Sequence, residues 1–140
     1  MATINRPVLV ATILLSACAK PVPVGMIDAL DYISNHLRHP CYQTAYGPVY
    51  AGGGRRCPSR DEHTDALAWC IREIGENLPD AQVTYVHGRF TCAGLPSVGC
   101  THGAEVVVSD VRDDVVTLCH ELLHVLIGDG EHLDARWRGL

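Results

Sequence analysis

The chain has 140 residues, of which 47% are apolar and 19% are charged. This length and balance suit a single globular domain and exclude a disordered, collagen-like or coiled-coil chain. The net charge is −5, and the 11 basic residues are scattered along the sequence. A nucleic-acid binder would carry a basic stripe or cluster, so we expect no nucleic-acid partner.

Residues 1–17 have the layout of a secretory signal peptide. One positive charge, Arg6, precedes an apolar run from Val8 to Leu15, far shorter than the roughly 18 to 20 residues that span a bilayer. The run ends Leu-Ser-Ala and is followed by Cys18. This ending resembles a bacterial lipobox, whose cysteine is lipidated and becomes the mature N-terminus. The resemblance implies a lipidated N-terminus and linker over residues 18–25, and a membrane-anchored lipoprotein of the bacterial cell envelope; an ordinary signal peptide cut at a neighbouring alanine is the alternative.

Seven cysteines are many for a chain of this length, and they point to an oxidising compartment or to a metal. Setting Cys18 aside leaves 7 − 1 = 6, an even number that can pair completely. Six cysteines allow fifteen pairings. Their positions beside loops and on helix faces favour three disulfides: Cys41–Cys57, Cys70–Cys119 and Cys92–Cys100. No C-x-x-C motif occurs, which argues against cysteine as a metal ligand.

Apolar periodicity predicts three helices and two strands after the linker. The helices are expected over 26–38, from an N-cap at Ser59 to just before Pro79, and over 114–127, and the strands over 82–90 and 104–109. Ser59 with Glu62 predicts a capping box, and Gly128 a left-handed end to the last helix. The Gly/Pro-rich segments 41–57 and 92–100 are expected to be loops. This order predicts one α+β domain over residues 26–140, with a small antiparallel sheet packed on helices.

The last predicted helix contains His120-Glu121-Leu122-Leu123-His124. Two histidines at i and i+4 project from one helix face, so both imidazoles can bind the same zinc ion. Glu121 lies about 100° round the helix and can reach a water on that ion. Zinc lowers the pKa of the water, Glu121 accepts its proton, and the hydroxide attacks a carbonyl that the metal polarises.

This H-E-x-x-H arrangement resembles the zincin metallopeptidases. The resemblance implies one Zn²⁺, Glu121 as the general base, and a peptide or protein substrate. A catalytic zinc takes a third protein ligand, which we expect to be His132, with Asp129 and Glu131 as open alternatives. His132 follows His124 by eight residues, two more than in the metzincin pattern. The chain is therefore expected to be a small secreted zincin-like protein and not a metzincin.

Two functions are compatible with these motifs. The first is a cell-envelope lipoprotein that acts as a zinc metallopeptidase. The second is a disulfide-rich zinc-binding envelope lipoprotein with a binding or structural role and no hydrolytic activity. The small mature chain favours the second, because it leaves little room for the far wall of a peptidase cleft. Glu121 favours the first, because a structural zinc site has no need of that glutamate.

Overall fold

The computed structural model describes residues 26–34, 37–128, 132–138 and 140. The expected signal peptide, Cys18 and the linker lie outside the described residues, as do Asp129 and Glu131. The elements in chain order are α1 (Ala29–Ser34), β1 (Arg38–Thr44), β2 (Gly47–Gly52), α2 (Arg60–Ile74), β3 (Gln82–Val86), β4 (Phe90–Cys92), β5 (Leu95–Ser97), β6 (Gly99–His102), β7 (Glu105–Ser109), α3 (Asp114–Ile127) and the short 3-10 helix η1 (Ala135–Trp137).

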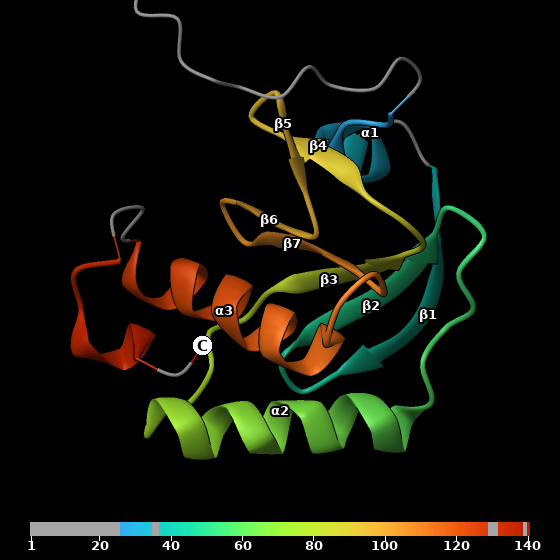
Figure 1. Ribbon diagram of the computed structural model, residues 1–140. Helices are drawn as coiled ribbons and strands as arrows, with labels where there is room; N and C mark the ends of the chain where they lie inside the picture. Colours follow the sequence, from blue (N-terminus) through green and yellow to red (C-terminus); the bar gives the residue numbers. More distant parts are fainter. Residues whose placement is uncertain (1–25, 35–36, 129–131, 139) are drawn as a thin grey trace, which may run out of the picture.

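The centre of the fold is a five-stranded sheet with the order β1-β2-β3-β7-β6 (Figure 1). Its outer pairs, β1–β2 and β6–β7, are antiparallel, whereas β3 runs parallel to both β2 and β7. The hairpin β4–β5 forms a separate two-stranded sheet. The expected α+β class is confirmed, but the sheet is mixed and not antiparallel as expected.

The parallel pairs arise because both connections to and from β3 are long. Helix α2 carries the chain from β2 across to β3, and residues 87–104 carry it from β3 to β7. A parallel pair needs a connection of a dozen or more residues, and both segments provide one. The segment 92–100, which was expected to be a loop, instead contains the end of β4, all of β5 and the start of β6.

The sheet buries both of its faces, and the three valines of β7 show how. Val106 and Val108 pack into the larger core, which α2 and α3 cover, while Val107 packs into a smaller core with α1 and β4. Alternate residues of a strand point to opposite faces, so a run of valines suits a strand that is buried on both sides. Figure 1 shows α2 and α3 below and beside the sheet, with α1 and the β4–β5 hairpin above it.

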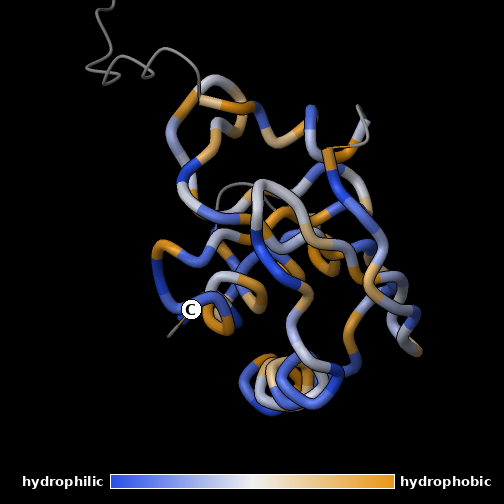
Figure 2. Tube along the Cα trace, turned by 90° about the vertical axis from the view of Figure 1, so that its right-hand side faces the viewer, coloured by the Kyte–Doolittle hydropathy of each residue, from blue (hydrophilic) through white to orange (hydrophobic). Residues whose placement is uncertain are grey.

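Both long helices begin where the sequence predicts, but α2 is shorter than expected: it ends at Ile74, where Gly75 adopts the left-handed conformation with φ 80°, and does not continue to Pro79. Ser59 and Glu62 form the expected capping box of α2, and Asp113 caps α3 by accepting from two backbone N–H groups. Gly128 has φ 67° and ends α3 in the left-handed conformation. Seen along its axis, α2 turns its polar residues outward (Figure 2). Its apolar stripe packs on α3, so the position of the predicted metal-binding helix is set by this interface.

The N-terminal part of the domain differs most from the expectation. The helix expected over 26–38 is shorter, and Arg38 already belongs to β1, where it forms a 2.9 Å ion pair with Glu105. The loop expected over 41–57 contains the β1–β2 hairpin. Pro40 lies in β1, an edge strand, where a missing N–H is tolerated. Similarly, the strand expected over 82–90 ends at Val86.

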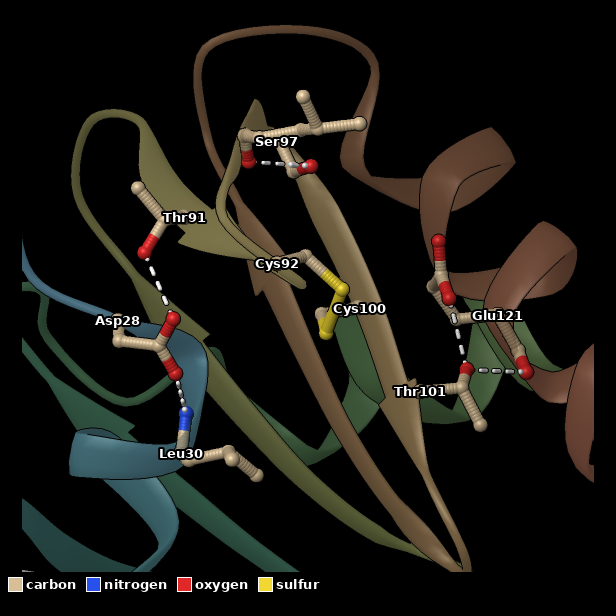
Figure 3. Close-up of a disulfide and its surroundings, with 9 residues drawn as sticks. Asp28, Leu30, Thr91, Cys92, Ser97, Cys100, Thr101 and Glu121 are labelled. Carbon is tan, nitrogen blue, oxygen red and sulfur yellow. Dashed lines mark hydrogen bonds between the residues drawn. A yellow bond between two sulfur atoms is a disulfide. The ribbon is translucent and has the colours of Figure 1, made fainter. Parts of the chain in front are cut away.

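Three disulfides join Cys41 to Cys57, Cys70 to Cys119 and Cys92 to Cys100, which are the pairs favoured from the sequence. They indicate an oxidising compartment. The second disulfide joins α2 to α3, and the third ties the end of β4 to β6 (Figure 3). In the part of the chain that the structure describes, no helix is both long and apolar enough to cross a bilayer.

Candidate metal centre

Three imidazoles converge at the C-terminal half of α3. His120 and His124 lie one turn apart on the helix, and His132 comes from the segment that follows it. The Nε2 atoms are 3.2 Å apart for His120–His124, 3.2 Å for His120–His132 and 3.1 Å for His124–His132. Three nitrogens bound tetrahedrally to one zinc at about 2.0–2.1 Å lie about 3.3 Å from one another. The group can therefore hold a single metal ion with little adjustment.

The backbone at His132 is held in an uncommon conformation. Its φ is 57°, in the left-handed region that side chains other than glycine seldom adopt. A non-glycine residue there costs on the order of 1 kcal/mol, so the surrounding structure has to impose it. The residue is exposed. In this conformation its Nε2 lies 3.2 Å from that of His120 and 3.1 Å from that of His124.

Trp137 packs against all three imidazoles. Its ring centroid lies 4.9 Å from that of His120, 4.5 Å from His124 and 4.3 Å from His132, and the residue is only 8% exposed. The ring therefore lies directly against the three histidines. It limits how far each imidazole can rotate away from the common centre.

The environment keeps His120 neutral. Burial, with the neighbouring His124 and His132 acting in the same direction, lowers its pKa to about 4. A metal binds the neutral imidazole, so a histidine with this pKa has a lone pair available at neutral pH.

Glu121 lies beside the histidines, at the contact of α3 with β6. It is 7% exposed, and the Thr101 hydroxyl lies 2.7 Å from its Oε2 and 3.0 Å from its backbone oxygen (Figure 3). Burial raises the pKa of the Glu121 carboxyl, and the hydrogen bond from Thr101 opposes that rise. Gly99 makes room for the side chain, because a Cβ there would overlap the Glu121 carboxylate.

A cleft of about 640 Å³ opens beside this centre. His120 and Glu121 lie at one end of it, and the start of α3 lies at the other. Its lining is formed by Arg89, Pro96, Ser97, Val98, Gly99, Arg112, Asp113, Val116, Thr117, His120, Glu121 and Leu140. The cleft has the size of a ligand-binding pocket, and it meets the edge strand β6 at Gly99.

A second group of potential ligands, formed by His39, Cys41 and Cys57, lies near the start of the sheet. Its two sulfur atoms are joined in a disulfide, so neither is a thiolate that could bind a metal. The histidine group on α3 is therefore the better candidate.

The sequence placed Glu121 and the three histidines together, but it missed Thr101 and Gly99. Both belong to β6, a strand that the sequence did not predict, and their spacing from Glu121 carries no local pattern. Comparison of the chain with family models, with curated proteins and with solved structures finds no match. The chemistry of the site has to be judged from its geometry.

Proposed function

We propose that the protein is a zinc-dependent peptidase in which His120, His124 and His132 hold the ion and Glu121 moves the proton. The observation that carries this proposal is the mutual approach of three Nε2 atoms to 3.2 Å or less, with a glutamate adjoining the first of them. Zinc bound there would supply a Lewis acid that lowers the pKa of water and polarises a substrate carbonyl.

Glu121 would act as the general base. Its carboxylate is buried, so its raised pKa makes it a stronger proton acceptor than a carboxylate in water. The Thr101 hydroxyl engages Oε2 and fixes the side chain, and Oε1, which packs against Gly99, would be the oxygen that accepts the proton of an attacking water. The same carboxyl can then donate that proton to the leaving amine, so Glu121 would serve first as the general base and then as the general acid.

The edge of the sheet supports a peptide as the substrate. β6 pairs with β7 on one side and is the last strand of its sheet. An extended peptide can add to such an edge as a further strand, with backbone hydrogen bonds giving affinity and neighbouring pockets giving specificity. Because Thr101 of β6 contacts Glu121, a peptide bound along this edge would pass beside the histidines.

The proposed location is the bacterial cell envelope. Three disulfides support an oxidising compartment, and the Leu-Ser-Ala-Cys sequence that ends at Cys18 supports a lipid anchor in the membrane. A lipidated Cys18 would leave an even number of cysteines, all of which are paired among the described residues.

The substitution Glu121→Gln tests the mechanism, because it keeps the shape of the side chain and removes the proton acceptor. We expect one zinc per chain in both the wild type and the variant, and a loss of peptide hydrolysis by about a hundredfold or more in the variant. Glu73→Gln, a change at an exposed residue of α2, is the matched control and should hydrolyse as the wild type does. Full hydrolysis by Glu121→Gln would exclude the proposed role.

A zinc-binding module without hydrolytic activity is the second candidate. It is favoured by the burial of Glu121 and its hydrogen bond to Thr101, which give that carboxylate a structural partner. This reading predicts that wild-type protein loaded with zinc cleaves no member of a broad peptide library. It also predicts that Glu121→Gln lowers stability and leaves zinc affinity unchanged.

A further inference from the structure

Two arginines in the cleft beside the histidines have no part in the proposed chemistry. Arg89 lies between β3 and β4, and Arg112 immediately precedes the N-cap of α3. Both residues are exposed, and neither forms an ion pair with any residue that the structure describes. The lining also holds two carboxylates, Asp113 and Glu121, so the feature that distinguishes the cleft is two arginines outside any ion pair and not a net positive charge.

The acidic groups around the cleft are engaged elsewhere. Asp113 accepts hydrogen bonds from two backbone N–H groups at the start of α3. Glu121 accepts from Thr101. Asp110, just before Arg112 in the chain, pairs with His87 and accepts from a backbone N–H. The two arginines therefore remain available to an anion that enters the cleft.

We propose that Arg89 and Arg112 bind a carboxylate of the peptide substrate and make the site selective for acidic peptides. This inference rests on the proposed function. A guanidinium presents a planar fork of N–H donors that matches a carboxylate, and two of them can hold both of its oxygens. The cleft continues from these arginines to His120 and Glu121, so one ligand can contact both ends.

The distance along α3 between Arg112 and His120 indicates which residue of the substrate the arginines would bind. Asp113, next to Arg112, and His120 are seven residues apart, which is about 10 Å along a helix. An extended peptide covers about 3.3 Å per residue, so the carboxylate lies about three residues from the cleaved bond. It can come from an aspartate or glutamate side chain or from the C-terminus of a short peptide, because the chemistry is the same.

Peptide binding tests this inference without requiring turnover. The protein is the full chain with Glu121→Gln, loaded with zinc, and the probes are short fluorescent peptides of alanine and serine. In the first series the C-terminus is amidated, and a single glutamate is placed at each position in turn, with glutamine at the same position as the control. The second series compares peptides with free and with amidated C-termini. We expect about tenfold tighter binding for glutamate at one position, or for the free C-terminus. Which series responds identifies the source of the carboxylate.

Substitution of the arginines completes the test. Arg89→Gln with Arg112→Gln should abolish the preference, and reversal of both charges to glutamate should transfer it to peptides with lysine. Arg56→Gln and Arg72→Gln, at exposed arginines outside this cleft, are the matched controls and should keep the preference. Equal binding of glutamate and glutamine peptides, binding of no peptide, or the same loss in the controls would overturn the inference.

Hydrolysis of the same peptides by the wild type separates the two proposals. If acidic peptides bind selectively but none is cleaved, the peptidase function fails and the carboxylate site stands. If peptides are cleaved without regard to an acidic residue, the carboxylate site fails and the peptidase function stands.

Discussion

His63 makes the stability of the fold depend on pH between about 4 and 6.5. The residue is 2% exposed in α2, with its Nδ1 2.7 Å from the hydroxyl of Tyr85. Burial lowers its pKa from 6.5 to about 4. Above pH 6.5 neither the folded nor the unfolded chain protonates this imidazole. Between pH 6.5 and 4 only the unfolded chain does, so the free energy of unfolding falls as the pH falls.

The magnitude follows from the shift. Each pKa unit is worth about 1.4 kcal/mol, so the full loss from His63 is about 3 kcal/mol, of which about 2 kcal/mol appears between pH 7 and pH 5. The measurement is urea unfolding of metal-free protein at both values of pH. His63→Gln should lose about 2 kcal/mol less than the wild type over this interval, whatever the substitution costs at pH 7.

Other titrating groups contribute equally to both proteins and cancel in the comparison. His102→Gln is the matched control, because that imidazole is exposed to water and should leave the pH dependence as in the wild type. Parallel curves for the wild type and His63→Gln would refute the reasoning.

Three further perturbations test other parts of the account. Thr101→Val removes the hydroxyl that holds the Glu121 carboxylate and should lower kcat about tenfold or more with the zinc content unchanged, as measured by metal analysis and initial rates. Replacing Cys70 and Cys119 by alanine opens a loop whose ends are 49 residues apart and should lower the free energy of unfolding by about 4 kcal/mol in urea; a loss under 1 kcal/mol would contradict the role given to this disulfide. Cys18→Ser should release the protein from membrane fractions, and a variant that stays wholly with the membrane would show that something other than the proposed lipid holds it.

The features that the sequence predicts well are those that local physics determines. The capping box at Ser59 and the left-handed Gly128 each depend on residues within one turn of a helix. The approach of His120 to His124 follows from helical spacing in the same way. His132 was expected to join them, and its Nε2 lies within 3.2 Å of both of theirs.

The features that the sequence misses depend on contacts between distant segments. Arg38 belongs to β1, where it forms an ion pair with Glu105, and no local sequence pattern predicts that pair. The parallel pairing of β3 with β2 and β7 depends on how the two crossovers pack, and periodicity alone cannot distinguish it from a hairpin. The contact of Thr101 with Glu121 joins an edge strand to a helix across 20 positions of sequence. The supporting residues of the site are therefore harder to predict than its candidate ligands.

The most direct test of the central claim is X-ray absorption at the zinc edge of protein loaded with one equivalent of zinc. The account predicts three imidazole nitrogens and one oxygen at about 2.0–2.1 Å, with one imidazole lost in His132→Ala. A sulfur ligand at about 2.3 Å would instead place the metal at the group of His39, Cys41 and Cys57. That result, or a spectrum unchanged by His132→Ala, would contradict the three-histidine centre.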